Sequence, residues 1–379
     1  MPTLWRVLAF LLVWDGILWG VPGWLFAPLL PGGWLAVLAM GIVLLAPFGV
    51  LARGFSEGAY PSAFTRVWIF RPFWYGQFFL LLLAPAGVAG ALAGLPFGAA
   101  REGGRVAVGI AAAALATLAL WGYAGTRRLV VRPLELAFDG LPEGLDGMRI
   151  VQLSDLHVGP HTRRRHLARV MDAVRAAEPD LVVLTGDQVD DYPRDVEPLG
   201  SAFGGLAAPL GVIAIAGNHD VYAGWGEVRR GMEALGWRVL VNEAVPLERG
   251  GSHLWVAGTG DPARGALRGG MDATPDVGRT LAGVPPGAFA IVLAHNPALW
   301  PELAARGVPL TLSGHTHYGQ LAIPRLGWSL ASPFLEHAMG LHTRNGATLY
   351  INPGTNYWGI PMRVGTPPEV TVVTLRRRA

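Results

Sequence analysis

Residues 149–157 read Arg-Ile-Val-Gln-Leu-Ser-Asp-Leu-His, a short apolar run that ends in an aspartate and a histidine. The same design recurs twice further along the chain. Residues 181–187 read Leu-Val-Val-Leu-Thr-Gly-Asp, and residues 212–220 read Val-Ile-Ala-Ile-Ala-Gly-Asn-His-Asp. Apolar runs bounded by Gly, Pro and Asp are typical of strands that are buried on both faces. These segments therefore predict an α/β domain in which polar side chains follow the strand ends.

Further strand-like runs and several helical segments extend this pattern to residue 375. The predicted strands cover residues 149–153, 181–185, 212–216, 254–257, 290–294, 310–313, 348–351 and 370–375. Helical patterns cover residues 164–177, 227–235 and 297–305. Strands that alternate with helices in this way favour a largely parallel sheet.

The histidines concentrate at these strand ends. All ten follow residue 150, and five stand next to Asp, Asn or Gly directly after a predicted strand: His157, His219, His295, His315 and His317. Scattered structural histidines would not be expected to fall in these places. Because ligands at the carboxyl ends of successive strands can converge on one crevice, we expect a single site.

The ordered motifs D-x-H, G-D, G-N-H-D, a lone histidine and G-H-x-H resemble the calcineurin-like metallophosphoesterase superfamily. The resemblance extends from about residue 145 to residue 375, and no expected motif is missing. The closing Asn-Pro-Gly-Thr at residues 352–355 and the segment 367–369 resemble its bacterial membrane-attached branch. The resemblance implies a four-layer α/β/β/α sandwich around two sheets, which we place at residues 127–379.

The resemblance also implies two divalent metal ions. The implied ligands of the first metal are Asp155, His157 and His317, those of the second are Asn218, His295 and His315, and the implied bridge is Asp187. Imidazole and carboxylate ligands suit Mn²⁺, Fe or Zn and tolerate Mg²⁺, and we expect Mn²⁺. A hydroxide between the metals would attack phosphorus while the metals bind the phosphate oxygens.

Two further residues are candidates for catalytic roles. By resemblance, His219 faces the leaving group and either stabilises its charge or donates a proton. Asp220 is expected either to orient His219 or to cap a helix. We interpret Asp190 and Asp191 as solvated loop carboxylates, and the basic run at residues 161–166 as a solvated helix face.

Three aromatic residues near these motifs have two interpretations. Tyr318, Tyr357 and Trp358 could shape a substrate pocket, or they could be ordinary rim or core aromatics.

The first third of the chain has a different composition. Hydrophobic residues make up 51% of the 379 residues and charged residues 15%, which is too apolar for an ordinary soluble protein. Four stretches are long enough to cross a bilayer: residues 4–20, 34–51, 73–95 and 106–123. The sequence therefore predicts an all-α transmembrane helical bundle at residues 1–126, in contact with the lipid bilayer.

Arginines predict the orientation of this bundle. With four crossings, one face carries Arg6, Arg53, Arg66, Arg71, Arg127, Arg128 and Arg132, whereas the other carries Arg101 and Arg105. Positive residues favour the cytoplasmic side, so we expect a multi-pass protein of the bacterial inner membrane with a cytoplasmic catalytic domain. Asp15, within the first stretch, is expected to snorkel or pair near the interface.

Composition also excludes several functions. Without cysteine, the chain has no disulfide, thiolate nucleophile or zinc–thiolate site. No basic strip with interleaved aromatics is present, so we expect no nucleic-acid partner. The leading hypothesis is hydrolysis of a phosphodiester or pyrophosphate in a membrane-associated, lipid-linked substrate. The alternatives are a membrane-tethered phosphatase for soluble phosphomonoesters or phosphoproteins, and a non-catalytic metal-binding membrane sensor or scaffold. The oligomeric state stays open.

Overall fold

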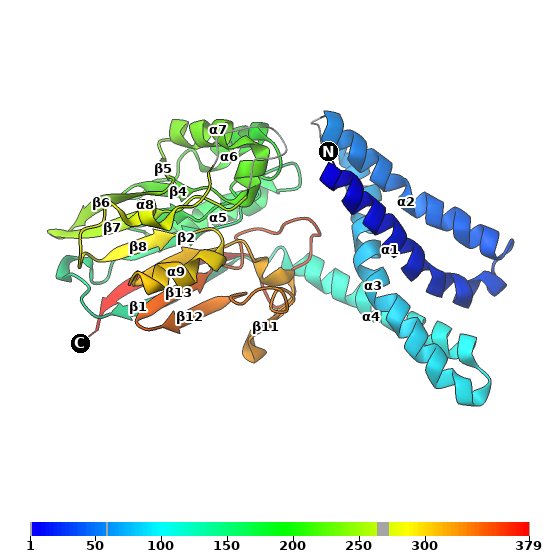
Figure 1. The fold of residues 1–379 in the computed structure, drawn as a ribbon. Helices are drawn as coiled ribbons and strands as arrows, with labels where there is room; N and C mark the ends of the chain where they lie inside the picture. Colours follow the sequence, from blue (N-terminus) through cyan, green and yellow to red (C-terminus); the bar gives the residue numbers. More distant parts are fainter. Residues whose placement is uncertain (1, 58–59, 264–272, 379) are drawn as a thin grey trace. The chain divides into compact units, whose positions relative to one another are not determined.

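The computed structural model describes residues 2–57, 60–263 and 273–378 (Figure 1). The chain divides into two compact units, Met1–Trp121 and Gly122–Ala379. The first unit is helical, and the second contains every strand of the described residues.

Long helices form the first unit. They are α1 (Pro2–Phe26), α2 (Trp34–Glu57), α3 (Arg71–Gly94), which a π-helical segment precedes at Thr65–Phe70, and α4 (Ala100–Gly125). Within the described residues, two helical segments are long and apolar enough to cross a bilayer: Thr65–Phe97, with 33 residues, and Ala100–Gly125, with 26. Trp34–Val50 is a shorter apolar segment. A total of four crossings therefore stays a prediction.

Asp15 on α1 is buried among the helices of the first unit, and its expected position near an interface stays a prediction. Its side chain is 5% exposed and faces a pocket of about 270 Å³ between α1, α2 and α3. The pocket exists because glycines from all three helices line it: Gly16, Gly41 and Gly76. Gln77 of α3 is the other polar residue of its wall.

The second unit contains two six-stranded sheets. The strand order of the first is β1 (Val130–Phe138), β14 (Glu369–Arg377), β2 (Arg149–Leu153), β3 (Leu181–Leu184), β4 (Val212–Ile215) and β5 (Arg238–Leu240). Strands β2 to β5 are parallel to one another, whereas β14 is antiparallel to β2 and parallel to β1.

The second sheet repeats this design. Its order is β12 (Gly340–Arg344), β13 (Ala347–Ile351), β9 (Leu310–Ser313), β8 (Ala290–Leu293), β7 (Ser252–Gly258) and β6 (Glu243–Arg249). The four inner strands are parallel, and each edge strand is antiparallel to its neighbour. A separate hairpin pairs β10 (Ala322–Ile323) with β11 (Trp328–Ser329).

Alternation along the strands places the two sheets face to face. Ile150 of β2 and Ile291 of β8 belong to one buried cluster between the sheets. Their neighbours point outward: Val151 packs with α5 (Arg164–Ala177), α6 (Val196–Phe203) and α7 (Asn218–Ala234), and Val292 packs with α8 (Val277–Leu281) and α9 (Trp300–Ala305). Because successive side chains point to opposite faces, the predicted four-layer α/β/β/α sandwich is confirmed.

Several strands were not predicted: β1, β5, β6, β10, β11 and β12, of which β1 is the longest. Strand β1 pairs in parallel with β14 from Val130↔Glu369 to Phe138↔Arg377. It is an edge strand that contains Pro133 and is exposed along much of its length, so its sequence resembles a connecting segment. The strand therefore extends the first sheet beyond β14.

Candidate metal centre

The seven predicted ligands lie in loops that follow parallel strands of both sheets. Asp155 and His157 follow β2, Asp187 follows β3, Asn218 begins α7 after β4, His295 follows β8, and His315 and His317 follow β9. Parallel strands bring their carboxyl ends to one edge of a sheet. The contacts described below show that the two edges supply donors to one site.

Most of these loops have an unusual backbone. Asp155, His157, Asp187, His315 and His317 all have a positive φ, between 40° and 71°. This left-handed conformation is rare for residues other than glycine and costs about 1–3 kcal/mol per residue. Five such residues at one site indicate that the surrounding sheets hold the backbone in place so that the side chains turn inward.

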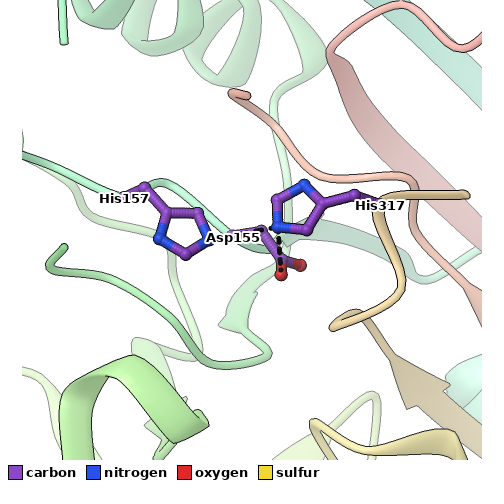
Figure 2. A group of neighbouring side chains, drawn as sticks. All are labelled: Asp155, His157 and His317. Atoms are coloured by element: carbon purple, nitrogen blue, oxygen red, sulfur yellow. Dashed lines mark hydrogen bonds and ion pairs between the residues drawn. The ribbon is translucent and has the colours of Figure 1, made fainter. Parts of the chain in front are cut away.

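The first donor set consists of Asp155, His157 and His317, whose side chains converge (Figure 2). One potential ligand atom from each lies within 4.8 Å of the others. Nε2 of His157 is 3.1 Å from Nε2 of His317, and the latter atom is 3.2 Å from Oδ1 of Asp155. Two ring nitrogens and a carboxylate oxygen at such distances fit one divalent metal ion.

The second donor set centres on Asn218. Its Oδ1 is 2.8 Å from Nδ1 of His315 and 3.1 Å from Nε2 of His295. Nδ1 of His295 donates to the carbonyl of Thr185 at 2.7 Å. This hydrogen bond orients the ring so that Nε2 faces the site, as in many metal-binding histidines.

Asp187 lies between the two sets. Its Oδ2 is 3.6 Å from Nε2 of His157 and 3.3 Å from Nε2 of His295. Its Oδ1 accepts a hydrogen bond of 2.8 Å from the backbone N–H of His219. One oxygen of this buried carboxylate therefore faces both donor sets.

Burial keeps three of the imidazoles neutral. It lowers the pKa of His157 to about 3 and the pKa values of His315 and His317 to about 4. A neutral imidazole offers a nitrogen lone pair, which is the form that binds a metal. These rings are consequently ready to coordinate at neutral pH.

The carboxylates stay ionised for a different reason. Burial alone would raise the pKa of Asp155 and of Asp187, but neighbouring histidines lower both values further than burial raises them. Conversely, burial would lower the pKa of His295, and the charge of Asp187 raises it well above the usual value. Imidazole nitrogens, two carboxylates and an amide oxygen together fit borderline divalent ions.

His219 occupies a different position from the ligands. Its Nδ1 donates to the carbonyl of Asp190 at 2.8 Å, and its ring packs edge-on against His157 with 4.7 Å between centroids. Burial lowers its pKa, but the carboxylates of Asp187 and Asp190 outweigh this effect, so the pKa is raised. The ring can therefore carry a proton on Nε2 at neutral pH.

The expected role of Asp220 as the partner of His219 is replaced by its other interpretation, a helix cap. Its carboxylate accepts three backbone hydrogen bonds, from Gln188 at 3.0 Å, Val189 at 3.1 Å and Gly217 at 2.9 Å. No hydrogen bond to the ring of His219 joins these among the described residues. Burial raises the pKa of Asp220 to about 7. Asp220 thus ties the loop after β3 to the start of α7.

Asp190 is also not the solvated carboxylate that we expected. The residue is 9% exposed, and its Oδ1 lies 3.5 Å from Nδ1 of His157. Burial raises its pKa to about 6. Its carboxylate and its carbonyl thus contact two different histidines of the site.

Arg363 was missed by the sequence analysis. It is 2% exposed and donates to the carbonyls of His317, at 3.1 Å, and Pro353, at 2.7 Å. Its Nη2 lies 3.1 Å from Nδ1 of His317. The available signal was a lone charge between Met362 and Val364. This arginine supports the loop that carries His317.

Two of the aromatic residues differ in their surroundings. Tyr318 is buried and donates to the carbonyl of Ile351 at 2.6 Å, so it belongs to the core. Trp358 is 47% exposed, and its ring centroid lies 5.2 Å from that of His219. Trp358 is therefore an exposed wall beside the site.

Gly314 allows the loop after β9 to approach the loop after β2. A Cβ atom at this position would collide with Oγ of Ser154 and Oδ2 of Asp155. We expect Gly314→Ala to displace Asp155 and to lose most bound metal, as measured by elemental analysis of the purified protein. Gly226→Ala, where the nearest side-chain atom is 3.7 Å from the added Cβ, is the matched control. Full metal content in Gly314→Ala would contradict the claim that the metal site requires a residue without a Cβ atom at position 314.

The buried imidazoles predict acid sensitivity in the metal-free protein. The pKa of His317 is about 4 in the folded state, compared with about 6.5 in an unfolded chain. Between these values the unfolded state binds a proton that the folded state does not, so the free energy of unfolding falls as pH falls. His157 and His315 act in the same direction. The raised pKa values of His219 and His295 instead contribute stability that is present below about pH 6.5 and lost at higher pH.

We therefore expect His317→Asn to reduce the slope of unfolding free energy against pH by about 1.4 kcal/mol per pH unit inside this window. Denaturant unfolding of chelator-treated protein measures the slope. His253→Asn, at an exposed position, is the control. An unchanged slope in His317→Asn would contradict the neutral, buried state of this ring.

Comparison with known proteins agrees with this site. The model of the calcineurin-like phosphoesterase family matches residues 148–319. A transmembrane protein with a metallophosphoesterase domain from Danio rerio is 34% identical over 276 residues, which cover 69% of this chain and only 61% of that protein. A metallophosphoesterase from Aquifex aeolicus is 31% identical over 260 residues, which cover 68% of this chain and 96% of that protein.

A metallophosphoesterase from Bacillus subtilis is 32% identical over 245 residues, which cover 62% of this chain and 82% of that protein. The similarity thus extends over almost the whole length of the Aquifex protein and includes the motifs that carry the site. The chain belongs to the calcineurin-like phosphoesterase family, a family of metal-dependent phosphoester hydrolases.

Proposed function

We propose that the protein hydrolyses a phosphodiester or pyrophosphate bond with two metal ions, in a membrane-associated or lipid-linked substrate. The observation that carries this proposal is the position of Asp187, one oxygen of which faces both donor sets. A bridging carboxylate is what a pair of metals about 3.5–4 Å apart requires.

The residues fit the metals in charge as well as in geometry. When bound, two divalent ions would polarise the phosphate and lower the pKa of a water molecule. Asp155 and Asp187 offset only part of the charge of two such ions, and Asn218 contributes a neutral oxygen. The site therefore stays positive and attracts a phosphate group. Mn²⁺ is the proposed metal, and Fe, Zn and Mg²⁺ suit many of the same donors.

His219 is the proposed general acid. The carbonyl of Asp190 holds Nδ1, which leaves Nε2 available to a substrate oxygen. The carboxylates of Asp187 and Asp190 raise the pKa of the ring, which favours its protonated form. Donation of this proton to the leaving oxygen would contribute about 10²–10⁴-fold to the rate. Asp220 would act only through the position of α7.

The membrane assignment rests on two findings. Within the part of the chain that the structure describes, two helical segments are long and apolar enough to cross a bilayer, and the Danio rerio relative is named a transmembrane protein. We extend these to a multi-pass region of about four helices at residues 1–126, located in the inner membrane, and a cytoplasmic catalytic domain at residues 127–379. The arginine bias supports this orientation.

Two other functions compete with this proposal. A tethered phosphatase would use the same donors on soluble phosphomonoesters or phosphoproteins. A sensor or scaffold would bind metal without catalysis, but it would have no need for a histidine that is held beside a complete donor set with its Nε2 available. The contacts of His219 therefore favour an enzyme.

Two variants separate metal binding from proton donation. In the full chain with Mn²⁺, Asp187→Asn is expected to lower metal content and to reduce kcat for a nitrophenyl phosphodiester by more than about 10²-fold, because the bridge is lost. His219→Gln is expected to keep its metal and to lose about 10²–10⁴-fold in kcat. The control is Asp172→Asn, at an exposed carboxylate of α5.

The outcomes discriminate among the functions. Equal activity in the parent and in Asp187→Asn would contradict two-metal catalysis. A preference for monoesters over diesters and lipid-linked esters would select the tethered phosphatase. Bound metal with no hydrolysis of any ester would select the scaffold.

The absence of cysteine allows a direct test of sidedness. We introduce Glu248→Cys, on β6, or Arg101→Cys, at the start of α4, as the only thiol of the chain. In intact spheroplasts, a membrane-impermeant maleimide should label Arg101→Cys and should label Glu248→Cys only after permeabilisation. The reverse pattern would place the catalytic domain outside the cytoplasm. Labelling of both cysteines in intact spheroplasts would contradict the single crossing by α4 that is proposed between residues 101 and 248.

A further inference from the structure

The exposed apolar side chains of the second unit are gathered in one segment. Among the described residues from Gly122 onward, seven large hydrophobic side chains are exposed, and five lie between residues 323 and 341. These five are Ile323, Leu326, Trp328, Phe334 and Leu341. Leu326 is 74% exposed and Phe334 is 82% exposed. We call this set the 323–341 surface.

The β10–β11 hairpin forms the centre of this surface. Its inward pair, Ala322 and Ser329, is buried, whereas its outward pair, Ile323 and Trp328, is exposed. A hairpin that faces water normally carries polar side chains on its outer face. Apolar residues on the outer face, together with the exposed tip at Leu326, indicate a surface that meets a partner.

Hydrogen bonds connect the hairpin to the rim of the metal centre. Gln320, just before β10, donates to the carbonyl of Trp358 at 2.8 Å and accepts from its N–H at 3.0 Å. Trp358 in turn packs beside His219. Polar contacts therefore fix the hairpin relative to the site of proposed chemistry.

A second set of hydrogen bonds connects the hairpin to the end of α4. The N–H of Ala322 donates to the carbonyl of Val364 at 2.9 Å, and the N–H of Val364 donates to the carbonyl of Gln320 at 3.0 Å. The adjacent N–H of Arg363 donates to the carbonyl of Gly122, in the last turns of α4, at 2.9 Å. All of these residues belong to the second unit. These bonds connect the hairpin to Gly122, and Gly122 lies in the last turn of a helix whose length and composition allow it to cross a bilayer.

The residue types of the surface match a lipid interface. Trp328 and Phe334 are bulky aromatics of the kind found where proteins meet lipid headgroups. Arg325, at the exposed tip between Ile323 and Leu326, supplies a positive charge that suits anionic headgroups. Apolar anchors beside a basic residue are typical of segments that lie in the interface plane.

We propose that the 323–341 surface docks onto the bilayer that α4 enters, and so keeps the rim at Trp358 at the level of the headgroups. A lipid surface fits better than a second copy of the chain because the same segment is bonded to the end of α4. The part of the inference that concerns the substrate rests on the proposed function, the hydrolysis of a membrane-associated phosphate ester. An amphiphilic phosphate ester could then reach the metal centre while its apolar part stays in the lipid.

Depth-dependent quenching tests docking independently of activity. Leu326→Cys, as the only thiol of the full chain, is labelled with an environment-sensitive fluorophore and placed in vesicles of phosphatidylethanolamine and phosphatidylglycerol with nitroxide-labelled lipids. The expected result is a blue shift and strong quenching. Glu248→Cys, on β6 at the opposite edge of the second sheet from β12, is the control and should stay unquenched.

Two outcomes would overturn docking. One is the absence of quenching at residue 326, or equal quenching at both positions. The other is a blue shift at residue 326 without lipid quenching that grows with protein concentration, which would assign the surface to a second copy.

Activity provides the second readout. In the Leu326→Asp/Phe334→Asp variant, we expect an unchanged kcat/KM for a soluble nitrophenyl phosphodiester. We expect the KM for a phosphodiester lipid in vesicles to rise about tenfold, which corresponds to about 1.4 kcal/mol. An unchanged KM for the lipid would overturn the substrate part of the inference. If the parent hydrolyses no ester, the proposed function fails, whereas the quenching result still decides docking.

Discussion

The metal centre depends on the electrostatic cost of burying carboxylates and imidazoles together. Asp155, Asp187 and His295 lie inside the protein, where ionised groups lose the stabilisation that water gives them. The two sheets hold these groups close enough that their charges offset one another, and burial keeps rings such as His157 neutral. The resulting arrangement of donors is suited to divalent cations. The strand order serves this arrangement, because it brings donors from both sheets to one site.

The backbone of the loops also helps to position the buried donors. A left-handed residue directly after a strand turns the chain sharply, so a side chain such as Asp155 or His315 points across the sheet edge instead of along it. The unfavourable conformation persists because hydrogen bonds anchor the loops from several directions. Asp220 connects the loop after β3 to α7, and Arg363 supports the loop of His317. These two residues contribute stiffness around the donors rather than donors themselves.

The sequence contained most of the site, and the physical reason is local. A buried parallel strand that ends in Asp, Asn or His can be recognised from a few consecutive residues, as residues 149–157 illustrate. The remaining features depend on contacts between distant segments. The partner of His219 is a carbonyl 29 positions away, the burial of Asp190 depends on a neighbouring histidine, and β1 becomes a strand only because β14 lies beside it. No local pattern contains that information, so sequence reasoning about these features was incomplete or wrong.

The pairing of β1 with β14 has a consequence for biosynthesis. Strand β1 follows α4 directly, so among the strands of the described residues it leaves the ribosome first. Its partner in the first sheet is β14, the last of these strands in the chain. Because β14 also lies between β1 and β2, the first sheet cannot be completed before residues 369–377 are synthesised, and β1 lacks its partner until then. The fold of this domain is therefore completed only after residues 369–377 have been made, when the helices that precede β1 have already left the ribosome.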